Sequence, residues 1–162
     1  MLIYALLVLT AIWTALTFLG APYPNELRLQ HSPTPFALAA LAWLHHRKYL
    51  SQAGIYCLLG FLWMHIFGAR WLYSMVPYDR WTSELFGKSI STLMGWQRNH
   101  YDRLVHFASG LLFTPPLFEL LSRKTDGARQ LSLANAFAWV LAIGAIYEIF
   151  EWQLAVNMSS PT

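Results

Sequence analysis

The stretch RNHYDRLVHFASGLLFTPPLFELLSR, residues 98–123, changes from a polar cluster into an apolar run long enough to cross most of a membrane. Asp102 and His106 are four residues apart, so a helix places both side chains on one face. A carboxylate beside an imidazole can fix the tautomer and the orientation of the ring. Because ionisable groups are costly where a membrane helix meets water, this pair indicates a site.

The composition predicts an integral membrane protein. Of the 162 residues, 56% are hydrophobic and only 12% are charged, whereas soluble domains average about 25% charged residues. The net charge of +3 is too small and too dispersed to indicate a nucleic-acid partner. Cys57 is the only cysteine, so no disulfide can form within the chain, and we expect no disulfide-linked partner. The first 24 residues carry no charged side chain, so we interpret residues 1–20 as a retained membrane helix rather than a signal peptide.

We predict an all-α integral membrane bundle that forms a single domain over residues 1–162. Five helices are expected at about residues 2–19, 33–49, 52–67, 103–121 and 131–154. The second is short for a span, so it either crosses with little tilt or enters the membrane and returns. Residues 25–35 are interpreted as a polar link.

The long connection over residues 70–98 is expected to contain an amphipathic segment on the membrane surface, between helices three and four. Its apolar positions Trp81, Leu85 and Leu93 approximate a helical stripe, and an ordered aromatic loop is the alternative. At the other end of the bundle, Ser51 is placed to cap the third helix. Glu119 and Arg123 are four residues apart and predict an ion pair.

The basic residues of the loops indicate which way the protein is oriented in the membrane. Five spans place the N-terminus, the Arg47–Lys48 loop and the loop from Arg123 to Arg129 on one side. These short loops carry basic residues more densely than the opposite side, although the totals on the two sides are similar. We therefore expect the N-terminus to be cytoplasmic.

Ionisable side chains from three helices are expected to meet at one end of this bundle. In an up-and-down arrangement the end of the third helix, the start of the fourth and the end of the fifth lie on the same side. These ends carry His65, Asp102, His106, Glu148 and Glu151. We predict a polar pocket there, with Asp102, His106, Glu148 and Glu151 as candidate catalytic residues.

The chemistry of the predicted pocket has several interpretations. Carboxylates and imidazoles can bind a divalent metal, but the spacing matches no ligand motif, so the metal and any cofactor stay open. They can also act as an acid–base pair on a lipid headgroup, with Arg70, Arg98 or Arg103 holding a phosphate. Alternatively, the cluster only locks the helices together. A proton or ion path is disfavoured because the ionisable groups gather at one end.

Four motifs resemble the YjdF-like family of bacterial inner-membrane proteins, whose function is unassigned. They are HxxGARxxYSxVP (residues 65–77), RNHYDRxVHFxxG (98–110), PPxxE (115–119) and YExxEW (147–152). The pattern of a DxxxH helix followed by a helix ending in Glu is also distantly similar to the VanZ-like membrane proteins. The resemblance implies an inner-membrane location. It also implies motif positions that include the candidate ligand-binding residues His65, Arg70, Asn99, Tyr101, Arg103 and Tyr147.

This chain differs from the family pattern in one respect. Members usually continue past YExxEW with an acidic GDxWD-type segment and a last helix, whereas this chain ends at Thr162. We therefore expect either a truncated chain or a shortened member of the family. The leading hypothesis is a multi-pass inner-membrane protein whose pocket binds a lipid headgroup or small polar ligand, with or without turnover. The alternative is a non-catalytic accessory subunit of a larger membrane complex.

Overall fold

The computed structural model describes residues 1–123 and 128–158. These residues form helices and connecting turns without a strand, which confirms the all-α prediction. In chain order the helices are α1 (Leu2–Leu16), α2 (Pro24–His31), α3 (Thr34–His46), α4 (Gln52–Ala69), α5 (Tyr78–Phe86), α6 (Ile90–Met94), α7 (Tyr101–Ser122) and α8 (Arg129–Met158).

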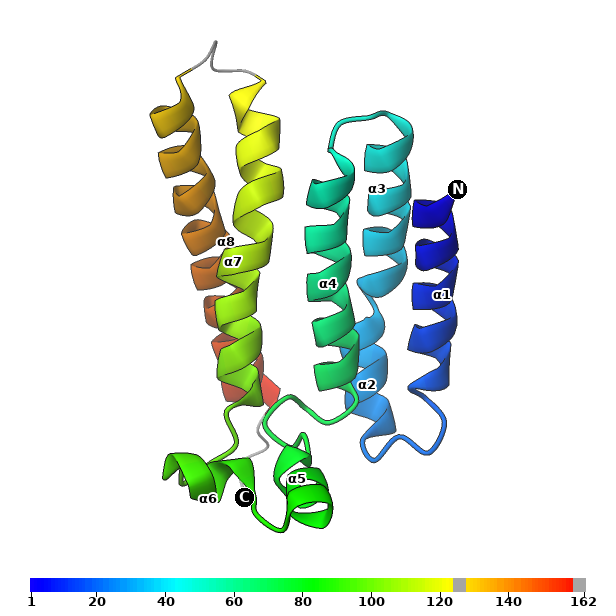
Figure 1. The fold of residues 1–162 in the computed structure, drawn as a ribbon, viewed down its shortest axis with the longest axis vertical. Helices are drawn as coiled ribbons and strands as arrows, with labels where there is room; N and C mark the ends of the chain where they lie inside the picture. Colours follow the sequence, from blue (N-terminus) through cyan, green and yellow to red (C-terminus); the bar gives the residue numbers. More distant parts are fainter. Residues whose placement is uncertain (124–127, 159–162) are drawn as a thin grey trace.

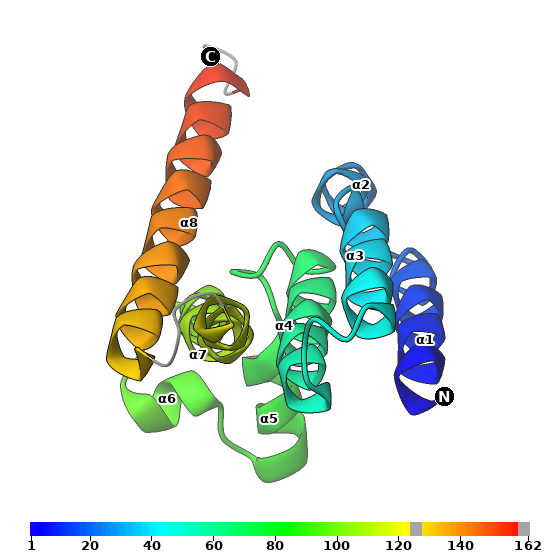
Figure 2. The ribbon, with the colours of Figure 1, turned by 90° about the horizontal axis from the view of Figure 1, so that it is seen from above.

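The long helices run alternately up and down (Figure 1). The helix α1 descends, α2 and α3 return, α4 descends, α7 ascends and α8 descends, as drawn there. The short helices α5 and α6 lie at the end of the bundle where α4 finishes and α7 begins, which we call the α5–α6 end. The end of α4 therefore lies beside the start of α7, as the predicted topology requires. The helix α8 leans away from α7 toward its own C-terminal end (Figure 2).

Among the described residues, three helices are long and apolar enough to cross a membrane: Gln52–Ala69, Tyr101–Ser122 and, within α8, Arg129–Ile149. The apolar helix α1 has 15 residues, and at 1.5 Å per residue it is about 22 Å long. The 13 residues of α3 cover about 20 Å. The helix α2 extends α3 at its lower end, with only residues 32 and 33 between them.

Two predictions about the N-terminal third were wrong. The predicted polar link over residues 25–35 contains α2, which begins with Pro24 in its first turn, a position that proline favours. Its buried side chains are Leu27 and His31, and His31 Nε2 lies 3.0 Å from Thr17 Oγ1. An apolar contact and a buried hydrogen bond therefore hold this otherwise polar helix. The first helix ends at Leu16 rather than residue 19, because residues 17–20 form a turn.

The core of the first half lies between α1, α3 and α4. Its buried side chains are Ile3, Leu7, Leu41, Leu50, Ile55, Leu59, Leu62 and Ile66. A partly buried hydrogen bond links α1 and α4 within this packing, since Trp63 Nε1 donates to Thr10 Oγ1 over 2.7 Å. The helix α7 packs against both α4 and α8 (Figure 2) and buries Val105 and Ala108. The α7 helix therefore joins the two halves of the bundle.

The predicted amphipathic segment forms two helices rather than one. The helices α5 and α6 each end at a glycine in the left-handed region, Gly87 (φ 74°) and Gly95 (φ 67°), which a side chain would disfavour. Asp79 Oδ1 accepts a hydrogen bond from the Ser91 amide over 2.8 Å and fixes α6 against α5. The segment is thus ordered and helical, and its place on a membrane surface stays a prediction.

Candidate functional site

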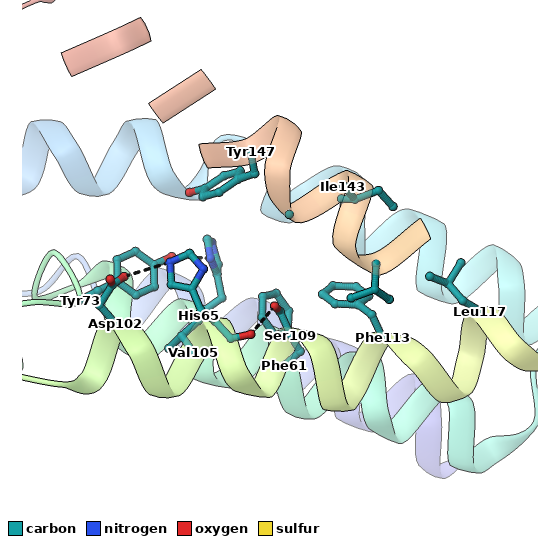
Figure 3. A pocket seen from close by; sticks show the side chains of 13 residues that line it. Phe61, His65, Tyr73, Asp102, Val105, Ser109, Phe113, Leu117, Ile143 and Tyr147 are labelled. Atoms are coloured by element: carbon teal, nitrogen blue, oxygen red, sulfur yellow. Dashed lines mark hydrogen bonds and ion pairs between the residues drawn. The ribbon is translucent and has the colours of Figure 1, made fainter. Parts of the chain in front are cut away.

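A cavity of about 320 Å³ lies between α4, α7 and α8, within the size range of small-molecule sites. Figure 3 shows its two ends: Tyr73, Asp102 and His65 gather at one, and Phe113, Leu117 and Ile143 line the other. The complete lining is Phe61, His65, Tyr73, Asp102, Val105, His106, Ser109, Phe113, Leu117, Val140, Ile143, Gly144 and Tyr147. The cavity is therefore polar near the α5–α6 end and apolar toward the middle of the bundle.

His106 lies between two carboxylates from two helices. Its Nε2 is 3.5 Å from Asp102 Oδ1 on the same helix, and its Nδ1 is 3.3 Å from Glu148 Oε1 on α8. Only a protonated imidazole carries N–H groups on both nitrogens, so only that form can donate to both partners. The side chains of His106, Asp102 and Glu148 are 43%, 44% and 60% exposed, so the cluster is not sealed between the helices. Asp102 and His106 line the cavity, whereas Glu148 does not.

The hydrogen bonds of His65 fix its tautomer. Its Nε2 is 3.2 Å from the Gln30 carbonyl oxygen, which can only accept, so Nε2 carries the proton. In the neutral ring Nδ1 is then an acceptor, and the Tyr73 hydroxyl donates to it over 2.6 Å. Both nitrogens are occupied by the protein, so His65 offers its ring surface to the cavity.

An unusual turn after α4 brings Tyr73 to His65. Leu72 and Tyr73 have φ values of 52° and 53°, a region that non-glycine residues adopt infrequently. The Tyr73 amide donates to the Gly68 carbonyl over 2.8 Å, which folds the turn back onto α4. A Cβ at Gly68 would lie 2.6 Å from Tyr73 Cδ1 and 2.8 Å from Tyr101 Cε1, so only glycine allows this approach.

Arg70 does not line the cavity, although the sequence predicted that it binds a ligand. Its guanidinium donates instead to the carbonyl oxygens that follow α1: Thr17, Leu19 over 2.9 Å and Gly20 over 3.2 Å. These carbonyls lack helical partners, so Arg70 acts as a cap between α4 and α1.

Three other predicted ligand-binding residues also lie outside the cavity lining. Asn99 donates through Nδ2 to the Val76 carbonyl over 2.6 Å and accepts from the Tyr101 amide over 2.9 Å. The Tyr101 hydroxyl donates to the Met64 carbonyl over 3.0 Å. Arg103 is exposed, with its Nη1 3.4 Å from Nδ1 of His100. The Asn99 and Tyr101 contacts tie the start of α7 to the turn after α4 and thereby place Asp102.

Of the predicted site residues, the structure thus brings together His65, Asp102, His106, Tyr147 and Glu148. The side chain of Glu151 lies outside the described part of the structure. Sequence reasoning did not select the remaining lining residues, of which Tyr73 is the most important for geometry. Tyr73 belongs to the motif HxxGARxxYSxVP, which was a signal for it. Its contact with His65 depends on a left-handed turn that the sequence does not reveal.

The remaining sequence predictions concern Glu119 and metal binding. Glu119 lies at the opposite end of the bundle, where its Oε1 accepts from the Ser51 amide over 2.6 Å and pairs with Arg123 over 3.2 Å. The predicted ion pair and the Ser51 cap, whose hydroxyl accepts from the Gly54 amide, are confirmed. Among the side chains that the structure describes, which exclude that of Glu151, no three of His, Cys, Asp or Glu are grouped to hold a metal ion.

The fold defines a helical membrane protein with several apolar helices, and its cavity between α4, α7 and α8 has polar side chains at one end. The chain belongs to the DUF2238 family of predicted membrane proteins, whose family model matches residues 1–161. It is similar to the inner membrane protein YjdF of Escherichia coli strain K12, with 33% identity over 92 residues. That match covers 56% of this chain but only 40% of YjdF. No solved structure matches the chain. The YjdF-like resemblance is confirmed, and the VanZ-like one stays a prediction.

Proposed function

We propose that this protein resides in a bacterial inner membrane and binds an amphipathic lipid in the cavity between α4, α7 and α8. One observation carries the proposal: a single cavity has Asp102 and His106 at one end and an apolar lining along the helices at the other. Glu148 pairs with His106, and we call these three side chains the His106 cluster. A lipid has the same division between a polar head and an apolar chain. The similarity to an inner membrane protein supports the location, and the basic loops support a cytoplasmic N-terminus.

The charges at the polar end of the cavity favour a particular kind of lipid headgroup. The cavity lining that the structure describes contains no lysine or arginine. The carboxylate of Asp102 lies there instead, beside His106, and Glu148 pairs with His106 from outside the lining. Arg70 is committed to the α1 carbonyls and is not available to a phosphate. A head that offers ammonium or hydroxyl donors therefore fits better than a bare phosphate.

The same cluster supplies the groups for turnover of a bound head. An imidazole between two carboxylates can give or take a proton, which is the requirement for general acid–base chemistry. His106 is the only imidazole of the described cavity lining whose nitrogens both face carboxylates, whereas both nitrogens of His65 are held by Gln30 and Tyr73. We therefore assign any proton transfer to His106, with Asp102 and Glu148 positioning its ring.

The test is lipid retention by purified protein. Wild type, Asp102→Asn and His106→Ala are extracted in mild detergent, offered phosphatidylethanolamine, and compared by native mass spectrometry. Because a hydrogen bond to a charged group contributes about 1.5–3 kcal/mol, each variant should lose about tenfold to a hundredfold in affinity. Glu84→Gln is the matched control, since Glu84 forms an exposed pair with Arg80 on α5, away from the cavity lining.

The outcomes separate this proposal from the alternative. Loss of lipid with unchanged thermal stability supports lipid binding. If both variants retain wild-type lipid but unfold at a lower temperature, the cluster is structural and the proposal fails. Stable co-purification with other membrane proteins would then favour the accessory-subunit hypothesis.

A further inference from the structure

A second cavity, of about 300 Å³, lies between α3, α4 and α7. Its lining is almost entirely apolar and consists of Pro33, Thr34, Ala37, Ala40, Leu41, Leu44, Leu58, Phe61, Leu62, His65 and Phe113. Three of these residues, Phe61, His65 and Phe113, also line the first cavity. The two cavities are therefore neighbours on either side of a shared wall.

The wall is a pair of aromatic rings. Phe61 of α4 and Phe113 of α7 have ring centroids 4.6 Å apart. In Figure 2, α7 and α4, the helices that carry these two rings, lie together, with α8 on one side and α3 on the other. We call the two rings the Phe61–Phe113 ridge. His65 lies nearer the α5–α6 end and borders both cavities.

The two cavities run in the same direction. In the second, Thr34 begins α3 on the side of α2 and Leu44 lies near its other end, ten residues or about 15 Å away. In the first, Asp102 and Leu117 are separated by about 22 Å along α7. The hydrocarbon core of a bilayer is about 30 Å thick, so one leaflet is about 15 Å. The lining of each cavity therefore extends over at least the depth of one leaflet.

Thr34 adds a polar group to the second cavity. It is 2% exposed, and its hydroxyl has no hydrogen-bond partner in the described structure. A buried hydroxyl without a partner costs free energy, which a ligand with an acceptor such as an ester carbonyl would recover. Thr34 and His65 both line this cavity. The second cavity thus has one hydrogen-bond donor in an otherwise apolar groove.

We propose that the ligand is a two-chain lipid that straddles the Phe61–Phe113 ridge, with one chain in each cavity. This inference rests on the proposed function and specifies its ligand class. The head lies at the His106 cluster, the ester region lies beside His65 and receives a hydrogen bond from Thr34, and the chains run in parallel away from the α5–α6 end. A one-chain lipid would leave the second cavity empty and the Thr34 hydroxyl without an acceptor.

Each cavity can be filled separately by substitution. A Cβ at Gly144 meets no atom within 4 Å, so Gly144→Leu extends into the first cavity without a clash at Cβ. Its control is Gly110→Leu, at an equally open glycine outside both cavity linings. Ala40→Phe fills the second cavity, and Ala39→Phe, on the same helix but outside both linings, is its control.

The probes are dioleoyl-phosphatidylethanolamine and its one-chain lyso form, titrated into the delipidated protein and followed by native mass spectrometry. Wild type should bind the two-chain lipid at least about tenfold more tightly. Ala40→Phe should abolish this preference and leave the lyso affinity unchanged, whereas Gly144→Leu should weaken both lipids. Thr34→Val, which keeps the shape and removes the hydroxyl, should weaken the two-chain lipid alone and should fold at least as stably as wild type.

The outcomes distinguish the two proposals. If Gly144→Leu weakens both lipids but Ala40→Phe and Thr34→Val keep the two-chain preference, the two-chain inference is overturned and lipid binding stands. If Ala40→Phe weakens both lipids equally, the second cavity belongs to a one-chain site and the inference is likewise overturned. If no cavity variant changes either affinity, both proposals fail.

Discussion

Substitution of Gly68 by alanine should loosen the turn that orients His65. The added Cβ would lie 2.6 Å from Tyr73 Cδ1, 2.9 Å from Tyr73 Cε1 and 2.8 Å from Tyr101 Cε1. Carbon atoms attract one another best at about 3.5–4.0 Å, so both rings must move by roughly 1 Å. Neither can move freely, because the Tyr73 hydroxyl is bonded to His65 and the Tyr101 hydroxyl to the Met64 carbonyl.

The expected cost follows from this overlap. Adding one methyl to a well-packed site typically destabilises by about 1–3 kcal/mol, and here it also threatens two side-chain hydrogen bonds. We therefore expect Gly68→Ala to lower the free energy of unfolding by about 2–4 kcal/mol. Denaturant titration in mixed micelles, followed by the fluorescence of the 8 tryptophans, measures it.

The matched control is Gly60→Ala on the same helix. A Cβ there meets only Leu112 Cδ1 at 3.9 Å, an ordinary contact. That variant should be neutral or more stable by up to about 1 kcal/mol, because alanine is the better helix former. Equal stability of Gly68→Ala and Gly60→Ala would refute the close packing of Tyr73 and Tyr101 on α4.

Two further predictions concern the contacts that hold the helix ends. Arg70→Met removes the donor to the Leu19 and Gly20 carbonyls and should lower the free energy of unfolding by about 1.5–3 kcal/mol. The control is Arg28→Met, at an exposed position on α2. Equal melting temperatures for the two variants would count against the cap. Glu119→Ala removes the acceptor for the Ser51 amide and should cost about 0.5–2 kcal/mol, with faster hydrogen exchange in the first turn of α4. Unchanged exchange there would exclude a capping role.

The sequence was sufficient to predict which ionisable residues share one end of the bundle, because the up-and-down order of the helices decides this. The number of membrane crossings between two helix ends decides whether they lie on the same side. The end of α4, the start of α7 and the later turns of α8 are therefore expected at one end of the bundle. The four-residue spacing of Asp102 and His106 then fixes their common face. These two rules predicted that His65, His106 and Glu148 would lie at one end, and the structure has them there.

The roles of individual polar residues were harder to predict. Arg70 and Tyr101 have the residue types of ligand-binding groups, but backbone carbonyls satisfy both. A sequence does not show which backbone groups lack partners, so a capping arginine and a binding arginine are alike in it. Tyr73 was not selected for a related reason, since its contact depends on two consecutive left-handed residues.

The second cavity and α2 also could not be predicted from the sequence. Small residues such as Ala37 and Ala40 are equally consistent with close helix packing and with an open groove. The helix α2 carries charged residues and was not predicted, and only the folded structure shows that Leu27 and His31 attach it to the bundle. Both features depend on how neighbouring helices are spaced, and that spacing is a property of the folded chain.

The most direct test of the account is an experimental density map of the protein in lipid nanodiscs. The account predicts that His106 lies between the carboxylates of Asp102 and Glu148, with density for a lipid head beside them. It also predicts two chain densities, one on each side of Phe61 and Phe113. A map in which His106 and Glu148 face different sides of the bundle, or in which side chains close both cavities and leave no lipid density, would contradict it.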